Sequence, residues 1–228
     1  IRHATSRIVS FAKRNNVPAF IVGHVTKEGT VAGPQLLAHM VDCVLYLEGE
    51  SPPANSAGTK ILRSFKNRFG DTTEVGLFSM EEQGLVEISN VTNFFMENSK
   101  KAVPGSCLTV VMEGSRPLIV EIQALTVLSN LSYPRRVSSG ISDRRLELLL
   151  AVIQNHLKVS LDRMDVFVNV VGGLKITETA SDLAVCLAIL SSYKNKPLNG
   201  TVALSEVGLL GELKSVINEK ARINEEIK

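Results

Sequence analysis

The chain has 228 residues, which is enough for one large domain or two modest ones. Its hydrophobic content of 44% and charged content of 21% are ordinary for a globular protein, and no apolar run approaches the ~20 residues that span a bilayer. The net charge of +2 excludes a strongly basic protein, so any contact with nucleic acid has to come from a local patch of cations.

The first half of the sequence predicts the closing part of an α/β sheet with antiparallel edge hairpins. A helix is expected over residues 1–15, where Ile8, Val9 and Phe11 form an apolar stripe. A short buried strand follows at 19–22, ahead of a glycine-containing loop at 29–34. The remaining elements are a short helix at 35–40 and strands at 43–47, 59–65, 75–80 and 85–88.

Residues 96–104 predict a domain boundary, because the pattern of strands and helices restarts after them. We therefore expect two domains, at 1–98 and 104–228. In the second domain, Ser142 is a good N-cap for a helix that runs to about His156. Further elements of the second domain are strands at 107–112, 118–128, 166–171 and 202–204, a helix at 180–190 with Thr177 and Thr179 as candidate caps, and a charged helical run at 218–228. The buried face of the helix that begins after Ser142 is predicted to carry Leu146, Leu149, Leu150 and Ile153.

The cysteines Cys43, Cys107 and Cys186 lie far apart in apolar segments and form no C-x-x-C pair. Buried free thiols are therefore expected, rather than a zinc site or a disulfide framework. The four histidines show no H-E-x-x-H spacing, and no metal site is predicted.

The string Lys66-Asn67-Arg68-Phe69-Gly70 ends a predicted strand and enters a turn. Side chains alternate along a strand, so Lys66 and Arg68 are expected on one side and Asn67 on the other. An ammonium and a guanidinium so placed can hold one polyanion, such as a phosphate group. The alternative is a solvated basic turn.

Three strings in this half resemble the RadA (Sms) recombination proteins of bacteria and plant organelles. They are the KNRFG motif at 66–70, GHVTKEGTVAGP at 23–34 and VDCVLYLEG at 41–49. The second half resembles the domain that RadA shares with the Lon proteases, on GGLKITETASDLAV at 172–185 and SEVGLLGEL at 205–213. The resemblance implies the C-terminal part of a RecA-like ATPase sheet, followed by a Lon-protease-like α+β domain of the ribosomal S5 type 2-like class.

The resemblance also implies ATP and Mg²⁺ as cofactors of the full-length protein, and zinc only through an N-terminal four-cysteine element. This sequence contains neither that element nor a G-x-x-x-x-G-K-[ST] phosphate loop. It begins with Ile1, so we expect a C-terminal fragment that does not hydrolyse ATP alone. The implied location is the bacterial cytoplasm or a plant plastid or mitochondrion, without membrane association.

The implied function is an ATP-dependent DNA repair and recombination protein that drives branch migration. The expected partners are single-stranded and branched DNA, a recombinase of the RecA type and further copies of the chain in a hexameric ring. Lys66 and Arg68 would reach the γ-phosphate bound by the neighbouring subunit and stabilise charge in the transition state. Phe69 is expected to pack and Gly70 to permit the turn, while Asn67 has no assigned role.

The loop after the strand at 19–22 is the second candidate site. His24, Thr26 and Lys27 would sense the γ-phosphate or contact the DNA backbone; a plain surface loop is the alternative. Four arginines around a Ser/Gly-rich loop could also contact phosphates, although a solvated loop and helix start explains them equally well. They are Arg135, Arg136, Arg144 and Arg145.

The Lon resemblance raises the question of a Ser/Lys peptidase. The serine position of Lon falls on Ala180, with Ser181 one residue late, and Lys220 falls near the catalytic lysine. One residue rotates a side chain by about 100° around a helix, and Asp182 beside the serine would oppose a neutral lysine. We expect no peptidase activity. The rival functions are an active Lon-type peptidase and a truncated DNA-binding or assembly module without enzyme activity.

Overall fold

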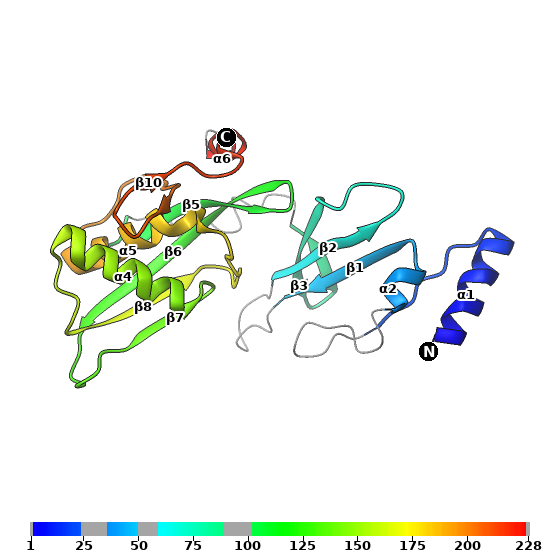
Figure 1. Cartoon of the computed structure of the whole chain (residues 1–228), viewed down its shortest axis with the longest axis horizontal. Helices are drawn as coiled ribbons and strands as arrows, with labels where there is room; N and C mark the ends of the chain where they lie inside the picture. The colour runs from blue at the N-terminus through cyan, green and yellow to red at the C-terminus, as the bar shows by residue number, and fades with distance from the viewer. Residues whose placement is uncertain (1, 24–35, 50–58, 89–101, 227–228) are drawn as a thin grey trace.

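The computed structural model describes residues 2–23, 36–49, 59–88 and 102–226, and these form a mixed α/β structure (Figure 1). Helices α1 (Arg2–Asn15) and α2 (Leu36–Met40) precede the first sheet, which is an antiparallel meander of four consecutive strands in chain order. Its strands are β1 (Cys43–Glu48), β2 (Thr59–Asn67), β3 (Val75–Glu81) and β4 (Gly84–Glu87). No helix in the described part of the chain is long and apolar enough to cross a membrane.

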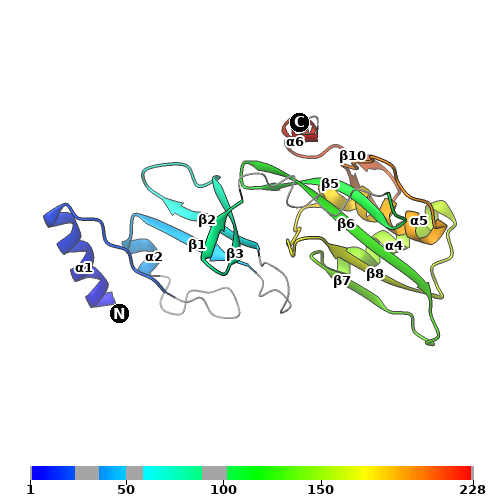
Figure 2. The ribbon, with the colours of Figure 1, turned by 180° about the vertical axis from the view of Figure 1, so that it is seen from behind.

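The second sheet has the strand order β5-β6-β8-β7, and only β7 and β8 pair in parallel. Two helices, α4 and α5, pack against it, and α6 lies near the ends of β5 and β6 (Figures 1 and 2). The bounds are β5 (Ser106–Glu113), β6 (Arg116–Leu128), β7 (Arg136–Ser139), α4 (Asp143–Leu157), β8 (Met164–Val170), the 3-10 turn η1 (Thr179–Ser181), α5 (Asp182–Lys194), β9 (Glu206–Val207), β10 (Leu213–Lys214) and α6 (Glu219–Glu226).

The helix α4 confirms the sequence prediction in detail. Ser142 is its N-cap, and the Ser142 side chain accepts a hydrogen bond from the Arg145 amide at 3.2 Å. The helix ends at Lys158, whose φ of 52° is left-handed. All four leucine and isoleucine side chains predicted to face the core are at most 3% exposed. A Ser cap and an apolar stripe at 3.6-residue spacing were therefore sufficient to place this helix.

The strand predicted at 19–22 is wrong. Residues 17–23 form no strand, and the side chains of Phe20 and Val22 are 91% and 90% exposed. A strand needs a neighbour for its backbone hydrogen bonds, and the described residues offer none there. The apolar stripe of α1 is also open to solvent, since Ile8 is 44% and Phe11 is 64% exposed.

Three local predictions in the second half also need correction. The strand expected at 202–204 does not form, because only an isolated bridge between Val202 and Leu108 is present there. The candidate caps Thr177 and Thr179 do not cap α5: its N-cap is Ser181, without a side-chain hydrogen bond. Thr179 donates its hydroxyl to Glu206 instead, at 2.7 Å. Strand β7 forms where the sequence predicts a Ser/Gly-rich loop, because a segment of four mostly polar residues is too short to show a strand pattern.

Adjacent leucines of α4 provide a test of this core. Leu149 is 1% exposed and Leu148 is 39% exposed. We expect Leu149→Ala to lower the free energy of unfolding by about 2–5 kcal/mol, because it leaves a cavity. Leu148→Ala should change it by about 0.5 kcal/mol. Urea unfolding followed by circular dichroism measures both, and equal losses would contradict the assigned helix face.

Candidate functional site

The end of β2 brings Lys66 and Arg68 to the C-terminal end of α2. The ammonium of Lys66 donates to the carbonyls of Ala38 at 2.8 Å, His39 at 3.3 Å and Val41 at 2.8 Å. These carbonyls lie where a helix leaves acceptors unsatisfied and where its dipole favours a cation. The three donors of the ammonium are all used in this arrangement.

Arg68 follows β2 directly and is held by Asp42. Its guanidinium Nη1 donates to Asp42 Oδ1 at 2.8 Å, and its amide donates to the Asp42 carbonyl at 3.0 Å. Its Nη2 reaches the His39 carbonyl at 3.4 Å, so Arg68 and Lys66 lie on one side of β2, as strand alternation predicts. The Arg68 side chain is 49% exposed. Since a guanidinium has five donors, Arg68 retains donors that can meet a ligand.

The other residues of the motif shape the turn after β2. Asn67 accepts from the Phe69 amide at 3.1 Å and donates to the Asp71 carbonyl at 3.5 Å, which gives Asn67 the role of stabilising its own turn. Phe69 is 84% exposed, so the expectation that it packs is wrong for the described residues. Gly70 is not in a left-handed conformation; a Cβ there would lie 3.0 Å from the Asn67 amide nitrogen. The turn therefore depends on Asn67 more than on glycine freedom.

The second candidate site cannot be compared with the structure. His24, Thr26 and Lys27 lie outside the described residues, and their role stays a prediction.

The position predicted from the sequence for a peptidase serine is closed. Ala180 and Ser181 are 3% and 2% exposed, while Lys220 lies exposed on α6. The buried cation of this region is instead Arg222, which is 1% exposed and pairs through two nitrogens with Glu178. Arg222 also donates to the Val110 carbonyl at 2.6 Å. Arg222 therefore holds α6 to β5 and to Glu178, which precedes the inaccessible serine by three residues.

Sequence reasoning missed this ion pair. Glu178 accepts from the Met112 amide at 2.9 Å in addition to binding Arg222, so it links β5, the turn before η1 and α6. Arg222 lies in the charged helical run predicted at 218–228, and its spacing does not distinguish it from the other charges there. No sequence signal marks a cation that tertiary contacts bury.

The chain resembles a set of curated proteins over essentially all of its length. It is 46% identical over 226 residues to the DNA repair protein RadA of Pseudomonas aeruginosa, which covers 99% of this chain. It is 47% identical over 229 residues to that of Haemophilus influenzae and 44% identical over 229 residues to that of Streptococcus pyogenes, each covering 100% of this chain. No protein-family model matches.

The chain belongs to the RadA family over the residues that it spans. It spans about half of the length of these relatives: 49% for the first two and 50% for the third.

The four arginines proposed as DNA contacts divide into two kinds. Arg136 donates to the carbonyls of Met164 and, at 2.8 Å, Leu161, and Arg145 pairs with the buried carboxylate of Asp182. Both guanidinium groups thus stabilise the packing of the second sheet and its helices. Arg135 and Arg144 are exposed, and a contact with DNA stays a prediction for them.

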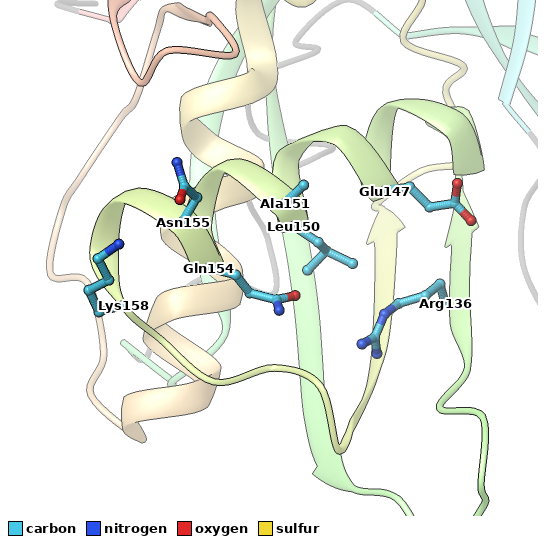
Figure 3. Close-up of a pocket in the computed structure, with 7 residues that line it drawn as sticks. All are labelled: Arg136, Glu147, Leu150, Ala151, Gln154, Asn155 and Lys158. Atoms are coloured by element: carbon cyan, nitrogen blue, oxygen red, sulfur yellow. The ribbon is translucent and has the colours of Figure 1, made fainter.

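A pocket of about 510 Å³ opens between α4 and β7 (Figure 3). Its central polar groups already have protein partners. Arg136 binds the Leu161 carbonyl, and Gln154 donates to Asp162 Oδ1 at 2.6 Å. Few groups remain to orient a ligand, so we assign no site to it. The lining residues are Arg136, Glu147, Leu150, Ala151, Gln154, Asn155 and Lys158.

The thiols differ in exposure. Cys107 and Cys186 are buried as expected, but Cys43 is exposed, which corrects that part of the prediction. Burial raises the pKa of Cys107 to about 11, and burial together with the charge of Asp182 raises the pKa of Cys186 to about 12.

Among the described residues, no three His, Cys, Asp or Glu side chains are arranged to hold a metal ion.

These differences predict the order of thiol reactivity. The thiolate is the reactive form, and a pKa of about 11 leaves only ~0.1% of it at pH 8. An aromatic disulfide reagent at pH 8 should therefore modify Cys43 rapidly and the two buried thiols slowly, until denaturant is added. Cys43→Ser should remove the rapid phase. Three equally fast thiols in the native protein would contradict the assigned burial.

The closed serine predicts that the second domain lacks peptidase activity. We expect no digestion of casein above background, and no difference between the parent chain and Ser181→Ala, because a 2% exposed hydroxyl cannot reach a peptide bond. Digestion that Ser181→Ala abolishes would restore the Ser/Lys peptidase as the function of this domain.

Proposed function

We propose that this chain is the part of a RadA-type DNA repair ATPase that supplies cations to a nucleotide bound by a neighbouring subunit. The observation that carries the proposal is the pair at the end of β2. Lys66 and Arg68 lie on one side of the strand within the KNRFG string, and Arg68 is half exposed. The similarity to proteins named DNA repair protein RadA supports the repair role.

The chemistry proposed for the pair is charge stabilisation during phosphoryl transfer. Arg68 offers free guanidinium donors to a γ-phosphate, as a planar fork suited to phosphate oxygens. Lys66 can join only if its ammonium leaves the carbonyls of α2, because its three donors are used there. ATP and Mg²⁺ would be bound by residues in the half of the relatives that this chain does not span.

The proposed architecture is the C-terminal part of a RecA-like ATPase domain at 1–98 and a Lon-protease-like domain at 104–228. The two separate four-stranded sheets, on either side of residues 89–101, support this division. The buried Ser181 and the Arg222–Glu178 pair favour a scaffold role for the second domain over peptidase chemistry.

The proposed biological activity is branch migration of recombination intermediates by a hexameric ring, together with a RecA-type recombinase. DNA would be gripped by loops that include His24, Thr26 and Lys27, with further phosphate contacts from Arg135 and Arg144. Such contacts are largely independent of base sequence. They should therefore weaken with rising salt.

A substitution at Arg68 tests the proposal. In the full-length protein we expect Arg68→Ala to lower the rate of ATP hydrolysis by about 10³-fold, because the charge of the transition state loses a donor. Lys60→Ala, also on β2 but away from the motif, should leave the rate within about twofold. Steady-state phosphate release measures both. An unchanged rate in Arg68→Ala would sink the proposed role.

A further inference from the structure

The hairpin of β5 and β6 extends from the second sheet to the first. Its tip, residues 113–116, lies against β2 and the β2–β3 turn in both views (Figures 1 and 2). At the tip, the amide of Ser115 donates to the carbonyl of Thr73 at 2.9 Å. The two sheets are thus joined by a backbone hydrogen bond as well as by the chain between them.

Gly114 makes this approach possible. Its φ of 61° is left-handed, and a Cβ at this position would lie 1.9 Å from the Thr73 carbonyl oxygen. In any other residue the Cβ would clash with this carbonyl, so the hairpin tip and the turn could not approach each other this closely. Gly84 provides a contrast: its φ is 115°, but nothing lies within 4 Å of the corresponding Cβ position.

An ion pair reinforces the contact. Arg63 of β2 binds Glu113 at the end of β5, and the Glu113 side chain is only 8% exposed. The same guanidinium binds Glu48 of β1 at 3.1 Å, where the Glu48 side chain is 56% exposed. Apolar packing continues across the contact, because Ile61 and Leu77 belong to the same buried cluster as residues of the second sheet. Separating the hairpin from β2 would leave the buried carboxylate of Glu113 without its cation, which lowers stability. The ion pair therefore favours this docked arrangement of the hairpin.

The turn that receives the hairpin also carries Arg68. Thr73 is fixed to Asp71 by its amide at 3.0 Å and by its hydroxyl at 2.7 Å, and Asn67 donates to the Asp71 carbonyl. Residues 68–74 are all exposed, so they have little burial of their own to hold them. The docked hairpin anchors the far end of this turn through the hydrogen bond from Ser115 to Thr73.

We propose that the β5–β6 hairpin tip positions the KNRFG turn, with Glu113 and Gly114 as positioning residues for Arg68. The second domain would thereby control how the phosphate-contacting cation is held. A displacement of about 1 Å in such a group can cost ~10²-fold in rate, so a fixed anchor matters. The catalytic part of this inference rests on the role proposed for Arg68; the docking itself does not.

Amide hydrogen exchange over residues 113–117 of the full-length protein tests the docking. Glu113→Gln and Gly114→Ala should each raise the exchange of the Ser115 amide by about tenfold or more, because docking protects it. The matched controls Glu48→Gln, which removes the other partner of Arg63, and Gly84→Ala, which adds a methyl group at an open positive-φ turn, should not. Unchanged exchange in both tip variants would overturn the proposal.

Kinetics of the same variants test the positioning. We expect Glu113→Gln to lower kcat for ATP by about tenfold with an unchanged KM, and to cause no further loss in an Arg68→Ala background. A tenfold loss that persists in that background would show a general structural effect and overturn the positioning role. If Arg68→Ala alone leaves kcat unchanged, the proposed function fails, while the exchange experiment still decides the docking.

Discussion

The ammonium of Lys66 satisfies three carbonyls at the end of α2, and the geometry of the candidate site depends on that contact. A five-residue helix is unstable on its own in water, so tertiary contacts, among them the one with Lys66, stabilise α2. Once α2 is fixed to β2, Asp42 lies where it can bind Arg68. Arg68 is consequently presented at the end of the strand in a defined direction, with half of its side chain in solvent. Lys66 thus has a structural role in this conformation.

Ion pairs also stabilise the part of the structure around the second sheet. Arg222 and Glu178 hold α6 against β5, and Arg145 and Asp182 hold α4 against the start of α5. Removing one partner of such a pair leaves a buried charge and costs about 3–5 kcal/mol. Asp182 follows Ser181 directly and Glu178 precedes it by three residues, and Ser181 is itself buried. The segment where the sequence predicts a degenerate peptidase site therefore contributes ion pairs that stabilise the fold.

Sequence reasoning placed the elements whose pattern is local. Alternation located β1 to β6 and β8, and the cap at Ser142 located α4. It failed where the outcome depends on what packs against a segment: the apolar residues 19–22 form no strand, and Phe69 has no cover among the described residues. For the site, alternation correctly placed Lys66 and Arg68 on one side. It could not reveal that α2 takes up the Lys66 donors, or that Arg136 and Arg145 bind within the protein, because those contacts join residues far apart in the chain.

The claim that Arg68 acts on a nucleotide held by a neighbour is tested most directly by mixing subunits. One full-length variant carries Arg68→Ala. The other carries a substitution in the phosphate-binding loop, which is proposed to lie in the half of the full-length protein that this chain does not span. Each should be inactive alone. The account predicts that mixing them restores ATP hydrolysis, because an intact phosphate loop can then meet an intact Arg68 from the adjacent subunit. If the mixture stays as inactive as its components while both variants still assemble together, Arg68 does not act across subunits and the account is contradicted.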